Sequence, residues 1–230
     1  MRAIVMREPG DADVLEMQEV ERPAPGDGDL LVRVASSGVN RADLLQREGR
    51  YPAPAGYSEQ VLGLEYAGTV EAVGHGVDRF AVGDAVMGIT GGGGYAEFVV
   101  ESASTAVAAP ANLDLVQVGA VPEVFMTAFD AAFVQEGLLK DETLLVHAVG
   151  SGVGTAALQL GARAGVTVIG TSRTPAKLER AAELGLTHGV VAEPGWPELI
   201  MKLTGGRGVD VILDLVGGPY LAGNQRVLAQ

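Results

Sequence analysis

The second half of the sequence alternates short apolar runs with segments of helical spacing. The first pair is an apolar run at 144–148 and a helical segment at 153–164, joined by a turn rich in glycine. Helical spacing at 116–133 precedes it, and the later elements are expected as strands at 166–171, 189–191 and 209–213 and helices at 175–184 and 197–203. Parallel strands need a long crossover that is usually a helix, so this alternation predicts a parallel sheet covered by helices.

The first half of the sequence has a different residue pattern. Gly and Pro interrupt it every few positions, and short alternating or β-branched runs lie between them, at 30–35, 68–73, 84–89 and 95–100. One segment, 42–48, has helix-forming composition and follows Asn40, a suitable N-cap residue. This pattern predicts a mainly β, barrel-like or sandwich-like domain. We therefore expect an α/β protein with one domain over 1–120 and a second over 121–230.

Composition argues against several classes of function. The net charge is −13, and an acidic surface repels phosphate backbones and anionic lipids, so neither a nucleic acid nor a membrane is expected as a partner. Cysteine is absent, which rules out disulfides, thiolate catalysis and Cys-ligated metal centres. Charges at Arg2, Arg7 and Glu8 argue against a signal peptide, and polar residues interrupt the longest apolar stretch. We expect a cytoplasmic protein.

The turn between the first strand and helix of the second domain has the sequence LLVHAVGSGVGTAALQL, residues 144–160. Gly152, Gly154 and Ala157 satisfy the spacing GxGxxA. Glycines at such a turn let backbone N–H groups and the positive end of the helix meet a pyrophosphate, and the place between strand and helix favours dinucleotide binding. The alternative is a purely structural turn.

The end of the second strand indicates which dinucleotide would bind. An Asp or Glu there would bind the 2′-hydroxyl of NAD and repel a 2′-phosphate, but no acid is present from Val166 to Lys177. Ser172, Arg173 and Lys177 instead offer a hydroxyl and two cations, so NADPH is favoured over NADH. The alternative is a solvated cationic start of a helix.

Several runs together resemble a known family. They are GVNRADLLQREGRYPAP at 38–54, LGLEYAGTVEAVG at 62–74, GGGYAEF at 92–98, VPEVFMTAFDA at 121–131 and HAVGSGVGTAALQL at 147–160. The chain resembles the zinc-independent quinone oxidoreductases of the medium-chain dehydrogenase/reductase superfamily, most closely the tumour-suppressor-inducible NADPH quinone oxidoreductase subgroup. The resemblance implies a GroES-like first domain and a Rossmann second domain, with NADPH as cofactor and a quinone as substrate.

Chains of that family continue past the position of Gln230. By resemblance, a sixth strand of the nucleotide-binding sheet and the return of the chain to the first domain would follow, so the fold is expected to be truncated at its C-terminus. Full-length members dimerise through this sheet edge. A homodimer is therefore expected for a full-length relative, and the missing edge argues against the same dimer here.

The resemblance also implies roles for particular residues. Asn40 and Tyr51 would face the nicotinamide and the substrate as catalytic residues, and Thr127 would touch the cofactor near the nicotinamide. The remaining cofactor contacts would be Val149, Gly150, Ser151, Gly152 and Val153 at the pyrophosphate, Ser172, Arg173 and Lys177 at the 2′-phosphate, and Asp214 and Val216 at a ribose. Where the family has a Tyr beside the 2′-phosphate, this chain has Ala192.

Structural alternatives stay open for some of these side chains. Asn40 could cap the helix that follows it, and Tyr51 could be a loop aromatic packed on Pro52. Three further polar residues are interpreted as structural rather than catalytic: Asp43, Glu65 and His147.

The residues at the family's metal position predict that no metal is bound. Zinc-dependent members carry a Cys where this chain has Asn40 and a His where it has Leu64, and Leu cannot coordinate a metal. Without a Lewis acid, suitable substrates are those that accept hydride easily, such as quinones or conjugated enones. The leading hypothesis is NADPH-dependent quinone reduction. The alternatives are an enoyl-thioester reductase, with Tyr51 as the candidate proton donor, and a catalytically weak NADP(H)-binding protein.

Overall fold

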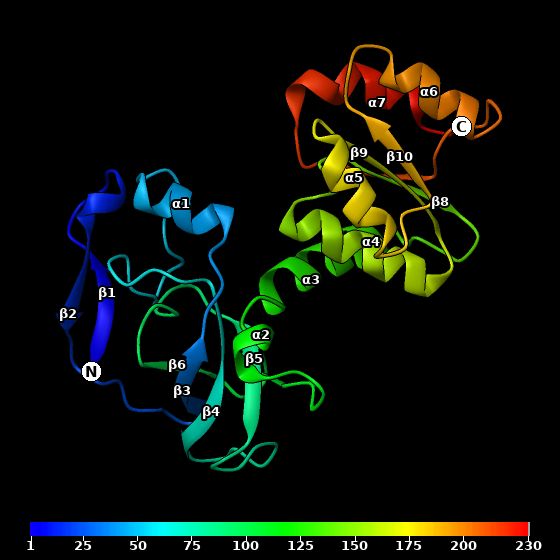
Figure 1. Cartoon of the computed structure of the whole chain (residues 1–230). Coiled ribbons are helices and arrows are strands. Elements are labelled where there is room, and N and C mark those ends of the chain that lie inside the picture. Colours follow the sequence, from blue (N-terminus) through cyan, green and yellow to red (C-terminus); the bar gives the residue numbers. More distant parts are fainter. Residues whose placement is uncertain (230) are drawn as a thin grey trace. The chain divides into compact units, whose positions relative to one another are not determined.

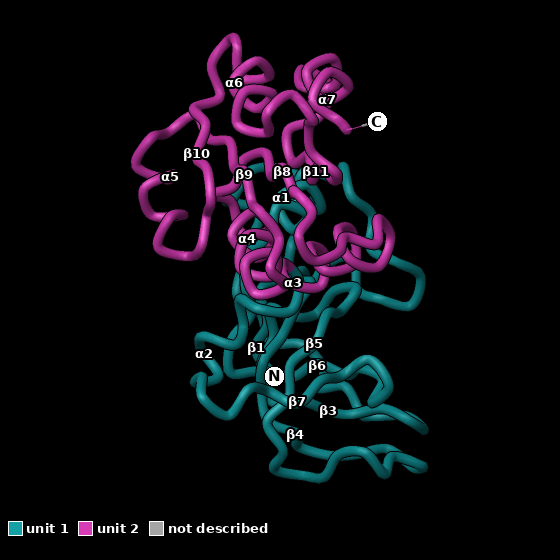
Figure 2. Tube along the Cα trace, turned by 90° about the vertical axis from the view of Figure 1, so that its right-hand side faces the viewer, with its two compact units in different colours: residues 1–123 teal, residues 124–230 magenta. Residues whose placement is uncertain are grey.

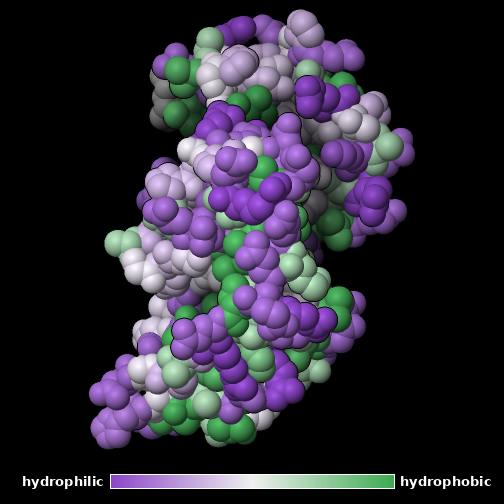
Figure 3. Space-filling view, turned by 90° about the vertical axis from the view of Figure 1, so that its left-hand side faces the viewer, coloured by the Kyte–Doolittle hydropathy of each residue, from purple (hydrophilic) through white to green (hydrophobic). Residues whose placement is uncertain are grey.

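A computed structural model describes residues 1–229, and the chain divides into two compact units between Glu123 and Val124. Figure 2 colours the two units separately. Unit 1 is mainly β and unit 2 is built on a parallel sheet, so the expected α/β fold class is confirmed (Figure 1). No helix among the described residues is long and apolar enough to span a membrane. Hydrophilic residues cover much of the face shown in Figure 3, with hydrophobic patches between them.

Unit 1 contains a five-stranded antiparallel sheet in the order β6-β3-β4-β5-β7. Its strands are β3 (Asp29–Ser36), β4 (Glu65–Val73), β5 (Ala85–Ile89), β6 (Phe98–Ser102) and β7 (Val107–Ala108). Alternate residues of β3 and β4 point inward, and Leu30, Val32, Tyr66 and Val70 form the centre of its core. The four strands expected in this half are present, although β6 begins three residues later than the pattern predicts.

The remaining elements of unit 1 pack around this sheet. A separate hairpin-like pair consists of β1 (Arg2–Met6) and β2 (Leu15–Glu19), with the short helix η1 (Ala12–Val14) between them. The sequence analysis missed this pair because the alternation in β2 is limited to Leu15 and Met17 and the strand is exposed over most of its length. The expected helix is α1 (Arg41–Arg47), and α2 (Leu115–Val118) follows the sheet.

Unit 2 carries a four-stranded parallel sheet in the order β10-β9-β8-β11. The strands are β8 (Thr143–Val146), β9 (Thr167–Ser172), β10 (His188–Val191) and β11 (Val211–Leu213). The helical segments are α3 (Pro122–Phe129), the π-helical turn η2 (Asp130–Gln135), α4 (Gly152–Ala164), α5 (Pro175–Ala182), α6 (Trp196–Leu203), the short η3 (Gly218–Tyr220) and α7 (Leu221–Val227). Every strand and helix expected after residue 140 is present within a few residues of its predicted bounds.

The two faces of this sheet are covered by different helices (Figure 1). Leu144, Val146 and Val168 pack with apolar residues of α4 and α5 on one face. Leu145 and Ile169 point the other way and pack with residues of α6 and α7. Burial on both faces explains why the strands read as continuous apolar runs rather than as alternating ones.

The segment with helical spacing at 116–133 forms more than one helix in the structure. The helix α2 ends at its C-cap Gly119, and α3 begins at Pro122. Pro lacks an N–H and tolerates the first turn of a helix but not its interior, so the chain starts a new helix there.

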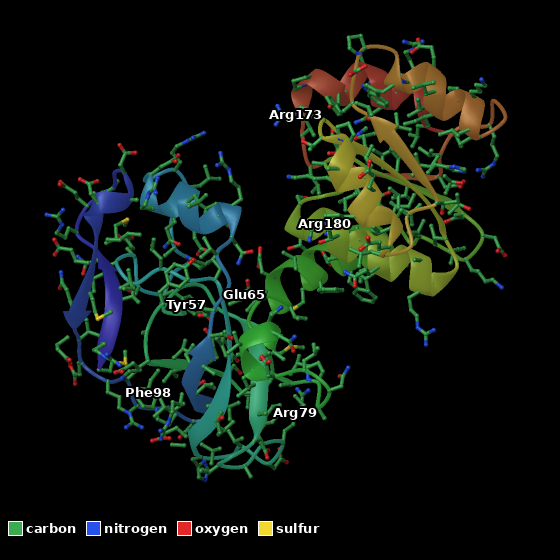
Figure 4. The ribbon with its side chains drawn as sticks, viewed as in Figure 1. Tyr57, Glu65, Arg79, Phe98, Arg173 and Arg180 are labelled. Carbon is green, nitrogen blue, oxygen red and sulfur yellow. The ribbon has the colours of Figure 1, made fainter. Side chains whose placement is uncertain are left out.

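Unit 1 also buries a carboxylate on β6. Glu101 lies opposite Leu30 in the sheet, is 5% exposed, and accepts a hydrogen bond of 3.2 Å from the hydroxyl of Tyr57, which Figure 4 labels. Burial raises the pKa of Glu101, and the hydrogen bonds that it accepts offset only part of this. The folded state therefore holds this proton to a higher pH than the unfolded chain does.

Glu101→Gln is expected to stabilise unit 1 at neutral and alkaline pH. Because the folded pKa is raised, the wild-type protein loses stability as the pH rises above about 4.5, the ordinary glutamate value, whereas a neutral amide has no such loss. Thermal unfolding from about pH 4 to about pH 8 should show a variant advantage that grows with pH. Glu21→Gln, an exposed control, should show none. A variant that is equally destabilised at every pH would contradict this account.

Candidate functional site

The turn from β8 to α4 is shaped by very close backbone packing. A Cβ on Gly154 would lie 2.6 Å from the carbonyl oxygen of Ala148 and 2.8 Å from the Cα of Val149, so only glycine fits at this position. Ala148 has a φ of 50°, in the left-handed region that L-residues rarely adopt. Ser151 is the N-cap of α4, and its hydroxyl oxygen accepts a hydrogen bond of 3.1 Å from the N–H of Gly154. A five-residue turn, 147–151, thus joins the end of β8 to the start of α4, and the first turn of the helix packs closely against it.

A cavity of about 530 Å³ opens beside this turn. Its lining comes from the segments that follow the carboxyl ends of all four strands, which is where ligands bind in open parallel sheets. The lining residues are Ala148, Gly150, Ser151, Thr171, Ser172, Arg173, Thr174, Lys177, Ala192, Leu215, Val216, Pro219 and Tyr220. The structure therefore brings together six of the residues expected at the cofactor: Gly150, Ser151, Ser172, Arg173, Lys177 and Val216.

The cationic side of the cavity is formed after β9. A Cβ on Gly150 would lie 2.9 Å from Cδ of Lys177, so the glycine lets the lysine side chain lie against the turn. Arg173 follows the same strand (Figure 4). Among residues 1–229, neither cation forms an ion pair with a carboxylate. The hydroxyl of Ser172 donates to the carbonyl of Thr174 and accepts from its N–H, which fixes the start of this loop.

Four of the expected cofactor residues do not present side chains to the cavity. Val149 is fully buried in the core beneath the turn, and Val153 packs against that core. Gly152 is the first residue of α4 and can reach a ligand only through its backbone. Asp214 accepts hydrogen bonds from the N–H groups of Val216 and Gly217, and although burial opposes them, these bonds lower the pKa of its carboxyl group. Asp214 thus shapes the loop that carries Val216.

His147 is a core residue, as the sequence analysis predicts. It is fully buried, and its Nδ1 lies 2.8 Å from the hydroxyl of Thr171 and its Nε2 2.7 Å from Oδ1 of Asn224. The amide nitrogen of Asn224 donates to Asp214, so its oxygen must accept from Nε2–H and the Thr171 hydroxyl must donate to Nδ1. Burial lowers the pKa of His147, which keeps the ring neutral. This network was not predicted, because Asn224 lies 77 positions from His147 in the sequence.

Tyr220 is a further cavity residue that the sequence analysis missed. Its ring lies 4.7 Å from that of His147, centroid to centroid, and it lines the cavity together with Ala192. It therefore supplies an aromatic side chain to the cavity that Ala192 also lines. No periodicity in the sequence points to it, since it follows a Gly-Gly-Pro turn.

Unit 1 holds the other group of expected site residues. Asn40 is the N-cap of α1, and its side-chain amide donates to Oε1 of Glu65 over 2.7 Å, while its backbone N–H donates to Asp43. Tyr95 donates to the same Asp43 oxygen over 2.9 Å, and Oε2 of Glu65 accepts from the backbone N–H of Glu123. Asn40 therefore caps the helix, as one of the two expectations had it, and its amide is held in one orientation. The other expectation, a role at the nicotinamide, stays a prediction.

Asp43 and Glu65 are structural residues of unit 1, as expected. They are 2% and 1% exposed, and burial raises the pKa of both carboxyl groups. Figure 4 labels Glu65 at the start of β4. Leu64 is buried beside it, and no group of three or more His, Asp or Glu side chains among residues 1–229 is placed to hold a metal ion.

Tyr51 and Thr127 are not among the residues that line the cavity of unit 2. Tyr51 is 45% exposed and lines a hollow of about 190 Å³ in unit 1, next to Pro52. Thr127 is exposed on α3. Their expected roles at the nicotinamide stay predictions.

Two protein families match the chain. The family described as "Alcohol dehydrogenase GroES-like domain" matches residues 26–111, and the family described as "Zinc-binding dehydrogenase" matches residues 152–230. The chain therefore belongs to the medium-chain dehydrogenase/reductase superfamily of NAD(P)-dependent oxidoreductases, with a GroES-like unit followed by a Rossmann-like, nucleotide-binding unit.

The curated relatives are much longer proteins. A phthioceranic/hydroxyphthioceranic acid synthase of Mycobacterium tuberculosis is 36% identical over 225 residues, which is 97% of this chain and 10% of the relative. A mycocerosic acid synthase-like polyketide synthase of the same organism is 34% identical over 229 residues, 97% of this chain and 11% of the relative. The chain thus spans about a tenth of the length of the curated relatives that it matches.

Solved structures cover the whole chain. The CurK enoyl reductase is 31% identical with a TM-score of 0.91 over 99% of this chain and 71% of that one. A quinone oxidoreductase of Pseudomonas syringae is 32% identical with a TM-score of 0.89 over 99% and 70%. A mycobacterial protein solved in complex with NADPH is 32% identical with a TM-score of 0.89 over 100% and 71%.

Lys177→Glu is expected to weaken NADPH binding about 10- to 100-fold while changing NADH binding much less, because a glutamate would repel a 2′-phosphate that the lysine is expected to bind. Titration calorimetry with each nucleotide measures both affinities. Lys202→Glu on α6 makes the same charge change away from the cavity and should leave the ratio of the two affinities unchanged. Equal losses for both nucleotides would contradict a 2′-phosphate contact at Lys177.

Proposed function

We propose that this chain uses NADPH to reduce the conjugated double bond of an α,β-unsaturated thioester. The observation that carries the proposal concerns the position where zinc-dependent members of the family carry a Cys and a His. This chain has Asn40 and the buried Leu64 there, and the amide of Asn40 is bonded to Glu65. A site without a Lewis acid suits substrates that accept hydride readily. Thioester chemistry is supported by the similarity to a solved enoyl reductase and to polyketide synthases.

The residues of unit 2 fit NADPH. Only glycine fits at residue 154, and the turn that it permits would offer backbone N–H groups to a pyrophosphate. The positive N-terminal end of α4 would add to this attraction. Arg173 and Lys177 would hold the 2′-phosphate in the cavity of about 530 Å³, beside Ser172. The bound cofactor would supply a hydride to the β carbon of the substrate.

Tyr51 would supply the proton. Addition of hydride to an enoyl thioester leaves an enolate, and the α carbon must then be protonated. The phenol of Tyr51 would donate this proton and regain one from solvent, which its 45% exposure permits. Asn40, oriented by Glu65, would position the substrate rather than exchange a proton, because an amide does not titrate.

Quinone reduction is the second candidate, and it is favoured by the similarity to the Pseudomonas syringae quinone oxidoreductase. A quinone takes its protons on oxygen, which exchanges freely with solvent, so no positioned acid is needed. Oxidation of NADPH with crotonyl-pantetheine and with an ortho-quinone separates the two candidates. Faster turnover of the thioester supports the proposal, and turnover of the quinone alone refutes it. Binding of NADPH without oxidation by either substrate would indicate a nucleotide-binding protein without this catalysis.

Tyr51→Phe is expected to lower kcat with the crotonyl thioester about 100-fold or more, because the general acid is lost. Turnover of an ortho-quinone by the same variant should change by no more than about twofold, because no positioned proton donor is involved. Absorbance of NADPH follows both reactions. Tyr57→Phe removes a phenol that bonds Glu101 and serves as the control. An equal loss with both substrates would mean that Tyr51 positions ligands without donating a proton.

A further inference from the structure

Glu65 is a buried carboxylate whose two oxygens accept hydrogen bonds at the starts of two different helices. It is the first residue of β4 and is 1% exposed (Figure 4). Its Oε1 accepts from the side-chain amide of Asn40, the N-cap of α1, over 2.7 Å. Its Oε2 accepts from the backbone N–H of Glu123, in the first turn of α3, over 3.0 Å. One side chain therefore joins the start of α1 to the start of α3.

The first turn of α3 gains an acceptor from this contact. The N–H groups at the start of a helix have no partner within the helix, and Pro122, the first residue of α3, has no N–H at all. The N–H of Glu123 is therefore the first donor of the helix, and a negative charge beside it also suits the positive end of the helix dipole. Thr127, which is expected near the nicotinamide, lies about one turn further along the same helix.

The surroundings of Glu65 fix how its carboxylate meets Asn40. A Cβ on Gly38 would overlap Oε1 of Glu65 and would lie 3.1 Å from the carbonyl oxygen of Gly119, so the glycine leaves the room that the carboxylate occupies. An ionised carboxylate accepts hydrogen bonds but donates none. The amide of Asn40 therefore turns its N–H end toward Glu65, and its carbonyl oxygen points away. Glu65 thus decides which end of this amide is left for a substrate.

We propose that Glu65 is a positioning residue for the reduction of the substrate, because it holds the amide of Asn40 and the first turn of α3 in one arrangement. The inference rests on the proposed function, in which Asn40 positions the substrate. A glutamine of the same size has one acceptor and one donor, so it can serve only one of the two N–H groups and opposes the other. Hydride transfer needs aligned reactants, and small misplacements slow it strongly. Glu65 acts on the reaction through Asn40 and α3, without touching the substrate.

Glu65→Gln tests this inference. At a temperature at which circular dichroism shows the variant to be folded, we expect kcat with crotonyl-pantetheine to fall about tenfold or more. The Kd of NADPH should change by less than about threefold, because the proposed phosphate contacts of the cofactor lie in unit 2. An unchanged kcat, or equal losses of kcat and of NADPH affinity, would overturn the inference.

Glu101→Gln is the matched control. It also neutralises a buried glutamate of unit 1, but one that bonds Tyr57 instead of Asn40. Its kcat should stay within about twofold of the wild-type value. A tenfold loss in this control as well would mean that any buried charge change in unit 1 slows the reaction, and would overturn a specific role for Glu65.

A double variant keeps the test valid if Glu65→Gln alone folds poorly. Asn40→Asp alone would set a second carboxylate against Glu65, whereas its combination with Glu65→Gln exchanges donor and acceptor. The new glutamine can then donate to the new aspartate and accept from the N–H of Glu123. The thermal midpoint of the double variant should lie above that of either single variant, while kcat stays about tenfold or more below wild type because no amide is left to position the substrate. Recovery of both midpoint and kcat would mean that Glu65 acts through stability alone.

Failure of the proposed function would look different. In that case the wild-type protein would not oxidise NADPH with crotonyl-pantetheine, whatever residue occupies position 65. The midpoints of the wild-type protein and the three variants need no substrate and still test the pairing on which the inference stands. Recovery in the double variant supports the pairing, and additive losses overturn it.

Discussion

The close packing of Gly154 against the turn that follows β8 is the constraint on which the cavity of unit 2 depends. Because the backbone around Ala148 and Val149 leaves no room for a Cβ at residue 154, the first turn of α4 packs against this turn. Ser151 satisfies one N–H group of the first turn of α4 and leaves the others for a ligand. Gly150 then admits the side chain of Lys177. The cavity, its helix terminus and its cationic side all follow from this packing.

Unit 1 contains a separate cluster of buried polar side chains. Asp43 and Glu65 are held inside the unit by Asn40, Tyr95 and a backbone N–H, so these two acids fix the orientation of the groups around them. Where zinc-dependent relatives would place ligands, this chain has an oriented amide and a buried leucine. The chemistry proposed for this chain relies on a substrate that accepts hydride without a metal, and on the phenol of Tyr51 to protonate the α carbon.

The sequence was a good guide wherever local pattern decides structure. The parallel sheet was predicted because buried strands and helical segments alternate, and the glycine-rich turn was predicted from the GxGxxA spacing of Gly152, Gly154 and Ala157 between a strand and a helix. Long-range contacts were not predictable in the same way. Asn224 bonds His147 across 77 positions of sequence, and Tyr220 lines the cavity from the last position of the short helix η3, directly after Gly-Gly-Pro. The buried side-chain amide of Gln46, on α1, has no hydrogen-bond partner among the described residues, and the sequence could not predict this because it depends on which side chains pack around the helix. The comparisons support the thioester alternative better than the leading quinone hypothesis, and a quinone oxidoreductase is also among the similar structures. Motifs shared across the superfamily describe the cofactor site better than the substrate.

The most direct test of this account is calorimetric titration of the unmodified chain with NADPH and with NADH. A glycine-lined turn flanked by Arg173 and Lys177 predicts binding of both nucleotides, with NADPH bound about tenfold or more tightly. Binding of neither nucleotide by the folded protein, or a preference for NADH, would contradict it.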